Sequence, residues 1–164
     1  MYGKQTETAI AAVSRLAEVY DGGKTRLTAD DIAEARGLQR PFVAKILTTL
    51  SQAGLVVGSR GPGGGYALAR PPKQIRLREV YQLFQRADDS NACPFGGGVC
   101  GAGHPCAIHD SLVEIQDRFD AFLESTNFEI FRYAFQVEGH RPVPSGTMPK
   151  SPKRASFRAP RTRG

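Results

Sequence analysis

The chain has 164 residues and a formal net charge of +6 at pH 7, and this length suits one compact domain or a small domain with an appended helix and tail. It has no run of about 18 apolar residues and no basic N-terminal segment leading into an apolar stretch, so we expect a cytoplasmic protein without a membrane partner. The three cysteines lie within fourteen residues, which argues against a disulfide framework and favours metal or redox chemistry.

Two short helices are predicted in the first part of the chain. The first ends at the Gly22-Gly23 pair, and its apolar residues at helical spacing are Ile10, Val13, Ala17 and Tyr20. The second is predicted over 29–35. Thr28 has the features of its N-cap, with Asp31 as the acidic member of a capping box, and Gly37 is expected to end it.

A third helix is predicted over 40–53, because Pro41 is tolerated in a first turn and apolar residues recur at helical spacing. The predicted buried stripe consists of Val43, Ile46, Leu47 and Leu50. Two helices joined by a tight glycine-containing turn, the second polar and basic on its outer face, are typical of a helix-turn-helix. Short apolar segments on either side of the glycine-rich run 59–65 then predict a β-hairpin wing.

The second half of the chain contains a helix predicted over 77–86, a loop rich in Gly, Pro and Cys over 88–105, and a long helix from Pro105 to about Asn127. The apolar residues of this last helix, spaced as in a coiled-coil seam, are Ile108, Leu112, Ile115, Phe119 and Phe122. A second copy of the chain is the simplest partner for the seam, so we expect a homodimer. The alternative is that the stripe packs only on the chain's own core.

Charge along the chain indicates where a polyanion would bind. Residues 22–86 hold eleven basic and four acidic residues, whereas 87–138 hold two basic and nine acidic residues, and 139–164 hold seven basic residues and no acidic ones. The basic middle region therefore favours double-stranded DNA as a partner.

Candidate DNA contacts are the polar residues that point away from the apolar stripe of the third helix, namely Gln39, Arg40, Lys45, Thr48 and Thr49. Gln39 and Arg40, at the N-terminal end of that helix, are the best-placed base readers. Arg60 at the wing tip is expected to contact phosphate or the minor groove. The alternative is that these residues form only a solvated face.

The three cysteines, Cys93, Cys100 and Cys106, are separated by six and five residues, and His109 follows three positions after the last. In a helix that begins at Pro105, Cys106 and His109 share one face of the first turn, so a thiolate and an imidazole can converge on one metal centre. Soft thiolates suit iron–sulfur clusters or zinc. A purely thiol-based redox switch is the remaining alternative.

The run from Gly54 to Tyr66, together with the cysteine loop, resembles the IscR/NsrR-type iron–sulfur transcription regulators of the Rrf2 superfamily, over about residues 1–135. The resemblance implies that the three cysteines ligate the cluster. In IscR-like members a histidine three positions after the third cysteine is the fourth ligand, which implies His109 and a 2Fe-2S cluster, the assignment we favour. In NsrR-like members an acidic residue of the other subunit is the ligand, which implies Glu7 of the partner subunit and a nitric-oxide-sensing 4Fe-4S cluster.

We therefore expect a mainly α fold with a small β-hairpin wing. A winged helix-turn-helix domain is expected over 1–86, a cluster-binding loop over 87–105, a dimerisation helix with a C-terminal core segment over 106–135 and a disordered basic tail over 139–164.

The expected function is that of a DNA-binding regulator, acting as a repressor on a pseudo-palindromic operator and sensing redox state, nitric oxide or iron–sulfur status. No nucleophile–base pair or paired carboxylates are evident, so no enzymatic activity is expected. The alternatives are a zinc-stabilised winged-helix regulator without a cluster and an iron–sulfur electron-transfer protein.

Overall fold

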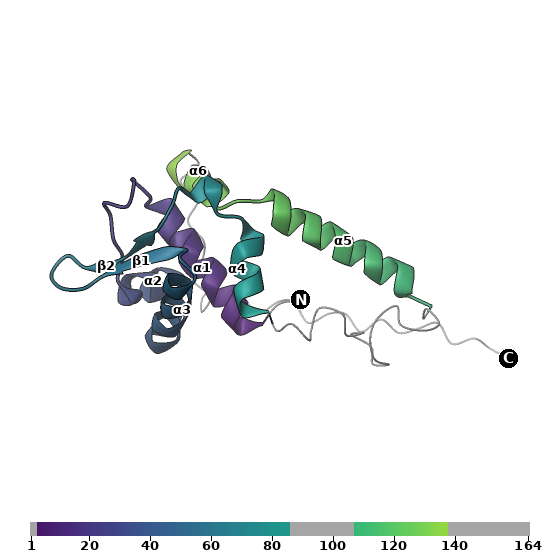
Figure 1. Ribbon diagram of the computed structural model, residues 1–164, viewed down its shortest axis with the longest axis horizontal. Helices are drawn as coiled ribbons and strands as arrows, with labels where there is room; N and C mark the ends of the chain where they lie inside the picture. Colours follow the sequence, from purple (N-terminus) through teal and green to yellow (C-terminus); the bar gives the residue numbers. More distant parts are fainter. Residues whose placement is uncertain (1–2, 86–106, 138–164) are drawn as a thin grey trace.

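The computed structural model describes residues 3–85 and 107–137. Their elements, in chain order, are α1 (Lys4–Glu18), α2 (Ala29–Arg36), α3 (Arg40–Gln52), β1 (Val56–Ser59), β2 (Gly65–Leu68), the 3-10 helix η1 (Pro72–Gln74), α4 (Leu77–Phe84), α5 (His109–Ser125) and α6 (Glu129–Val137). The helices α1 to α4 gather into one body, from which the hairpin extends on one side and α5 on the other (Figure 1). The predicted mainly α fold with a β-hairpin is confirmed. None of the described helices is long and apolar enough to span a membrane.

The helix α1 lies at the centre of the core, because α2, α3, α4, α6 and the strand β2 all pack against it. Its buried apolar residues recur at helical spacing and include Ala9, Val13 and Leu16, each at most 2% exposed. Burying a side chain the size of leucine contributes about 1.5–3 kcal/mol. The predicted end of this helix at Gly22-Gly23 was wrong by a turn, because the helix ends at Glu18 and Tyr20 lies beyond it. Gly22 and Gly23, both at a φ of +86°, belong to the loop that follows.

The predicted capping box at the start of α2 is confirmed. The amide of Asp31 donates to the Thr28 hydroxyl at 3.1 Å, and the amide of Thr28 donates to the Asp31 carboxylate at 2.7 Å. Hydrogen bonds from the hydroxyl and the amide of Thr28 hold the pKa of Asp31 below its usual value. Gly37, in the left-handed conformation with a φ of 62°, ends the helix and turns the chain toward α3.

The helix α3 has the predicted boundaries to within one residue, with Pro41 in its first turn. Its predicted apolar stripe is buried, and Val43, Leu47 and Leu50 have no exposed surface. This stripe packs on α1 and α2, so the opposite face of α3 is left toward solvent. The core therefore fixes which side chains α3 presents outward.

The wing is a two-stranded antiparallel hairpin in which Val56 pairs with Leu68 and Ser59 pairs with Gly65. The backbone of Tyr66 also exchanges two hydrogen bonds with Leu27, of 2.7 and 2.9 Å, which ties the hairpin to the segment before α2. Position 65 requires glycine, because its φ is +138° and a Cβ there would lie 2.8 Å from the Leu27 carbonyl oxygen. The predicted hairpin is confirmed.

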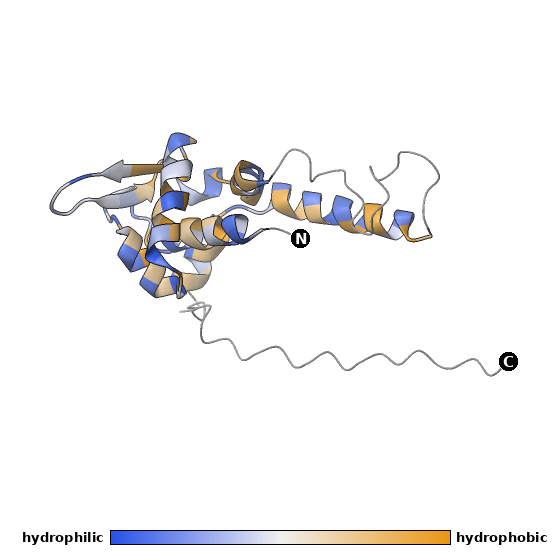
Figure 2. Ribbon diagram, turned by 90° about the horizontal axis from the view of Figure 1, so that it is seen from below, coloured by the Kyte–Doolittle hydropathy of each residue, from blue (hydrophilic) through white to orange (hydrophobic). Residues whose placement is uncertain are grey.

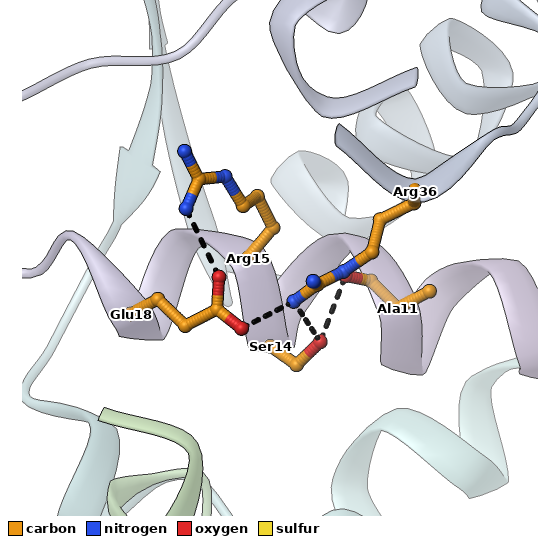
Figure 3. A network of polar contacts seen from close by, with 5 residues as sticks. All are labelled: Ala11, Ser14, Arg15, Glu18 and Arg36. Carbon is orange, nitrogen blue, oxygen red and sulfur yellow. Dashed lines mark hydrogen bonds and ion pairs between the residues drawn. The ribbon is translucent and has the colours of Figure 1, made fainter. Parts of the chain in front are cut away.

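A buried ion-pair network joins α1 to α2 (Figure 3). Arg36 Nη2 lies 2.7 Å from a carboxylate oxygen of Glu18 and donates to the Ser14 hydroxyl at 3.0 Å, while its Nε donates to the Ala11 carbonyl oxygen at 3.2 Å. The side chains of Arg36 and Glu18 are only 7% and 3% exposed. Arg15 approaches the second oxygen of Glu18 at 3.0 Å, so both oxygens of this buried carboxylate accept hydrogen bonds.

The C-terminal half of α5 is held to α4 by backbone and side-chain contacts. The amide of Leu77 donates to the Thr126 carbonyl oxygen at 3.0 Å. Arg78 lies 3.6 Å from Glu124 and 3.9 Å from Asp120, and Arg76 also pairs with Glu124. The N-terminal half of α5 extends away from the body of the molecule in both views (Figures 1 and 2).

The start of α5 differs from the prediction. The helix begins at His109 rather than at Pro105, because Ala107 and Ile108 form a turn and Ile108 has a non-helical ψ of 8°. His109 is the first residue of this helix, and Cys106 lies outside the described residues, so the expected i, i+3 relation between the two stays a prediction.

The predicted apolar seam of α5 was also wrong in one part. Phe119 packs on Tyr81 of α4, with ring centroids 5.6 Å apart in an edge-to-face arrangement. Leu123, which the seam omitted, is buried at 2% exposure. The physical reason is the tether to α4, which turns the 119/123 side of the helix toward the chain's own core. Ile108, Ile115 and Phe122 remain 43%, 58% and 50% exposed.

Candidate nucleic-acid interface and metal ligands

The outer face of α3 carries the predicted DNA-reading side chains. Gln39 is its N-cap residue but makes no side-chain capping hydrogen bond, so its exposed amide is not used to hold the helix end. Arg40 and Lys45 are also exposed on this helix. No acidic residue lies in α3, whose sequence runs RPFVAKILTTLSQ. The face therefore presents amide and cationic donors, the groups that bind base edges and phosphates.

In the absence of DNA, Arg40 forms an ion pair with Asp30. Its Nε lies 2.6 Å from a carboxylate oxygen of Asp30 at the start of α2, and both side chains are mostly exposed, at 69% and 58%. An exposed ion pair of this kind contributes only about 0–1 kcal/mol. The guanidinium of Arg40 can therefore exchange Asp30 for a phosphate or a base at little cost.

Thr48 and Thr49 differ from the other predicted contacts. Their hydroxyls donate to carbonyl oxygens one turn back, Thr48 to Ala44 at 3.0 Å and Thr49 to Lys45 at 3.4 Å. Thr48 is exposed, whereas Thr49 is half-buried. With the hydroxyl protons committed to the helix, the oxygen of Thr48 is available as an acceptor, for instance from a base amino group.

A hollow of about 340 Å³ lies between α3 and the wing and brings Thr48 and Arg60 to one place. The other residues that line it are Ser51, Gln52, Gly58, Ser59 and Tyr66. The sequence reading missed these residues. Ser51 and Gln52 follow Thr48 by three and four positions on the same helix face, a signal that was readable, whereas the approach of Tyr66 to α3 depends on the tertiary fold.

The predicted metal ligands are only partly within the described residues. Cys93, Cys100 and Cys106 lie outside them. His109 is the first residue of α5 and is half-buried. Glu7 is exposed in the first turn of α1, where its carboxylate lies 3.2 Å from Lys4. No group of three metal-binding side chains occurs within residues 3–85 and 107–137.

The two candidate fourth ligands lie on separate parts of one chain. In both ribbon views the N-terminal end of α1 lies beside the body of the molecule, whereas α5 begins at its far, projecting end (Figures 1 and 2). Glu7 and His109 are therefore alternatives within one subunit rather than members of one cluster of ligands.

A helix-turn-helix with a polar and basic second helix, followed by a hairpin wing, defines a winged-helix DNA-binding protein of the transcription-regulator class. Residues 2–131 match the family model Rrf2, described as "Iron-dependent Transcriptional regulator". Because this match covers most of the chain, the chain belongs to the Rrf2 family of transcriptional regulators.

Curated relatives agree with this assignment. A putative HTH-type transcriptional regulator of Aquifex aeolicus is 30% identical over 102 residues, which is 61% of this chain and 71% of the relative. The HTH-type transcriptional regulators IscR of Cronobacter sakazakii and of Escherichia coli O1:K1 are 34% and 33% identical over 95 residues, 58% of this chain and 58% of each relative. The chain thus spans little more than half the length of the IscR relatives.

Solved structures show the same fold. The global cysteine regulator CymR of B. subtilis superposes with a TM-score of 0.66 at 21% identity, covering 81% of this chain and 97% of CymR. The IscR of T. potens superposes with a TM-score of 0.62 at 22% identity, covering 82% of this chain and 88% of that protein. The predicted winged-helix fold is therefore confirmed.

Proposed function

We propose that this regulator binds a pseudo-palindromic operator in double-stranded DNA as a homodimer, and that an iron–sulfur cluster held by Cys93, Cys100 and Cys106 controls the binding. The observation that carries the proposal is the outer face of α3, where Gln39 and Lys45 are exposed and whose C-terminal part lines a hollow together with the wing. In a cytoplasmic repressor of this kind, sensing of redox state, nitric oxide or iron–sulfur status changes promoter occupancy.

Each segment has a proposed part in this function. Residues 1–86 form the DNA-reading domain, 87–105 hold the cluster, and 106–135 pair the subunits. The basic tail 139–164 adds salt-sensitive affinity that does not depend on DNA sequence.

Replacement of Lys45 and of Gln39 should affect DNA binding in different ways. Lys45→Ala should weaken binding to operator and unrelated duplexes alike, and should lower the salt slope of log K by about 0.9 for each phosphate that Lys45 neutralises. Gln39→Ala should instead reduce discrimination between operator and unrelated duplexes, by about 1–3 kcal/mol for each base pair read. Fluorescence anisotropy between about 50 and 200 mM salt, the range over which counterion release is usually resolved, measures both effects.

Lys73→Ala provides a control for Lys45→Ala, because Lys73 is exposed on η1, which packs beside α6 rather than α3. The operator is first selected from a random duplex library with the wild-type protein. If no duplex were enriched, or if Lys45→Ala left the salt slope unchanged, the assignment of α3 as the DNA-reading helix would be wrong.

The homodimer is supported by the exposed apolar residues of α5. Ile108, Ile115 and Phe122 follow each other at seven-residue spacing, which is the repeat of one coiled-coil position. Leu112 occupies the alternate seam position and is half-buried, whereas Phe119 at the equivalent position already packs on Tyr81 of α4. A second α5 that packs along this seam would cover the exposed apolar side chains of Ile108, Ile115 and Phe122.

The charges of α5 fit the same pairing. Its acidic residues all fall at heptad positions away from the seam, and they are Asp110, Glu114, Asp117, Asp120 and Glu124. Two copies can therefore approach without bringing carboxylates together in the apolar interface. Asp120 and Glu124 are in addition neutralised by Arg78 of α4.

The iron–sulfur proposal is supported by the chemistry of the donor set. Three thiolates with one weaker nitrogen or oxygen ligand fit an iron–sulfur cluster, and His109 or Glu7 of the partner subunit can complete the set. When bound, such a cluster supplies a centre that reacts with oxidants and with nitric oxide. His109 favours a 2Fe-2S cluster and Glu7 a 4Fe-4S cluster.

Separate substitutions should identify the fourth ligand. In protein purified anaerobically, His109→Ala should change the visible absorption spectrum and the iron and sulfide content, because an imidazole ligand is removed, whereas Glu7→Ala should leave both unchanged. The reverse result would assign Glu7, and an effect of neither would exclude both. Asp110→Ala, at the neighbouring exposed position, is the control for local disturbance of α5.

The same preparations test the regulatory role. Cluster-containing and cluster-free protein should differ in affinity for the selected operator at matched salt, and equal affinities would contradict control by the cluster. Colourless protein with stoichiometric zinc, unchanged by reconstitution with iron and sulfide, would instead support the zinc-stabilised alternative.

The described residues provide a path from the cysteine segment to the DNA-reading helices. The helix α5 begins three residues after Cys106, and its C-terminal half is joined to α4 through Arg78. The helix α4 packs on α1, which supports α2 and α3. A change at the N-terminal end of α5 can therefore alter the relative position of the two DNA-reading domains in a dimer.

A further inference from the structure

The hollow between α3 and the wing faces a particular part of a DNA duplex. In a winged-helix complex the second helix of the helix-turn-helix enters the major groove and the wing reaches an adjacent minor groove. One sugar–phosphate strand separates any two adjacent grooves. A protein that places α3 in one groove and the hairpin in the next must therefore straddle that strand, and the hollow is the surface that meets it.

The lining of the hollow suits a phosphodiester group. Thr48, Ser51 and Gln52 come from α3, and Ser59, Arg60 and Tyr66 come from the wing. The lining contains one cation, three aliphatic hydroxyls, a phenol and a side-chain amide, and it contains no carboxylate. Phosphate contacts in protein–DNA complexes are made by these side-chain types.

The donors of the hollow are not used elsewhere in the described part of the chain. Among residues 3–85 and 107–137, the side chains of Ser51, Ser59 and Tyr66 have no hydrogen-bond partner, and Arg60 has no ion-pair partner. Thr48 is the exception, since its hydroxyl donates to the Ala44 carbonyl oxygen. Donors from two elements thus converge on a cavity without satisfying one another.

Tyr66 is held in position by the hairpin. It pairs with Gly58 across the two strands, and a Cβ at Gly58 would lie 3.3 Å from Cε1 of the Tyr66 ring. Position 58 is therefore open enough for the ring to lie against the strand. The two backbone hydrogen bonds to Leu27 fix the same residue from the other side. A donor ordered before binding loses little conformational entropy when a ligand arrives.

We propose that this hollow binds one phosphodiester group of the DNA strand that lies between the grooves occupied by α3 and the wing, with Tyr66 and Arg60 as the principal donors. The site extends the proposed function and rests on it. It adds affinity and sets the position of the protein along the duplex, while base discrimination stays with Gln39 and Arg40. Tyr66 is thus a backbone-contacting residue of the interface as well as part of the wing.

The first test is Tyr66→Phe, which removes one hydroxyl and keeps the ring against Gly58. Its affinity for the selected operator and for an unrelated duplex should fall by the same factor, about tenfold, because a hydrogen bond to a charged oxygen is removed. Tyr133→Phe, at an exposed position of α6, is the matched control and should leave both affinities unchanged. Unchanged thermal unfolding of Tyr66→Phe separates the effect from a folding defect.

The second test locates the phosphate. Operator duplexes are prepared with single phosphates replaced, one position at a time, by uncharged methylphosphonates. The wild-type protein should lose affinity at one phosphate per half-site that lies between the segments contacted by α3 and by the wing. At that phosphate Tyr66→Phe should cause no further loss, whereas at every other phosphate its tenfold effect should persist.

The outcomes separate this inference from the proposed function. If the wild-type protein binds its operator and Tyr66→Phe binds it equally well, the phosphate site is wrong and the DNA-binding proposal stands. The same conclusion follows if the loss of affinity caused by Tyr66→Phe adds to the loss caused by every one of the methylphosphonates. If Tyr66→Phe weakens only the operator and not the unrelated duplex, Tyr66 reads sequence and the inference is overturned. If the wild-type protein enriches no duplex, both proposals fail.

Discussion

Replacing Glu18 with alanine should lower the free energy of unfolding by about 3–5 kcal/mol, the usual cost of removing one partner of a buried ion pair. Arg36, whose side chain is only 7% exposed in the wild type, would lose its ion pair with Glu18, whereas the Ser14 hydroxyl and the Ala11 carbonyl oxygen to which it donates carry no charge. For a domain of this size the melting temperature should fall by about 10–20 °C. Calorimetry and urea denaturation measure the two quantities.

A matched carboxylate controls for the loss of charge itself. Glu114 pairs with Arg118 at 2.6 Å on α5, but the two side chains are 63% and 79% exposed. Glu114→Ala should therefore cost less than about 0.5 kcal/mol. Equal losses in Glu18→Ala and Glu114→Ala would show that the α1–α2 network is hydrated in solution.

A double replacement tests the mechanism of the Glu18 effect. Glu18→Leu combined with Arg36→Met removes both charges and keeps apolar volume, so most of the stability lost in Glu18→Ala should return. If the double variant were as unstable as Glu18→Ala, specific hydrogen bonds rather than an unpaired charge would explain the loss. Because α2 carries Arg36, this comparison also shows how far the network fixes the helix-turn-helix.

Local signals in the sequence were sufficient for the winged-helix elements. The Thr28–Asp31 capping box, Gly37 in the left-handed conformation and Pro41 in the first turn of α3 each depend on residues within a few positions of one another. The glycine-rich tip of the hairpin is equally local, because the strand pairing from Val56 to Leu68 closes a short loop. Such features are determined by backbone geometry that a single sequence reveals.

Features that depend on distant contacts could not be predicted in the same way. The partners Arg36 and Glu18 are eighteen residues apart, and nothing in their local sequence indicates that they meet in the core. The seam of α5 was assigned from spacing alone, which cannot show that α4 covers Phe119. The hollow likewise depends on the hairpin bringing Tyr66 toward the last turn of α3.

The start of α5 shows a third limit. Proline is favoured in a first helical turn, which led the prediction to Pro105, yet the helix begins at His109 after a turn at Ala107 and Ile108. A proline that permits a helix does not require one at that residue. The proposed role of His109 as a ligand rests on the resemblance and on donor chemistry, since Cys106 lies outside the described residues.

The α5 seam leads to the second large effect. Ile115→Glu should convert the homodimer to a monomer, because it places a carboxylate from each subunit in the middle of an apolar interface. Ile115 is 58% exposed in the single chain, so the fold of the subunit should be unaffected. Sedimentation equilibrium gives the oligomeric state. Affinity for the full operator should fall by about 100-fold or more, since the second half-site no longer adds to binding.

Val113→Glu distinguishes the seam from the helix as a whole. Val113 is also apolar and 41% exposed, but its heptad position lies outside the Ile108–Ile115–Phe122 line. This variant should remain dimeric with operator affinity close to that of the wild type. If Val113→Glu dissociated the dimer and Ile115→Glu did not, the interface would lie on another face of α5. If both variants remained dimeric, the interface would not lie on α5.

The monomeric variant should still read DNA. Gln39, Arg40 and the wing lie in the DNA-reading domain, whose core is contacted by Phe119 of α5 but leaves Ile115 58% exposed. Ile115→Glu should therefore bind an isolated half-site with the same affinity per subunit as the wild type, and lose only the gain that the second half-site provides. If its half-site binding fell as well, the α5 seam would be needed for the structure of the DNA-reading domain itself. Pairing and DNA recognition could then not be treated as separate functions of the chain.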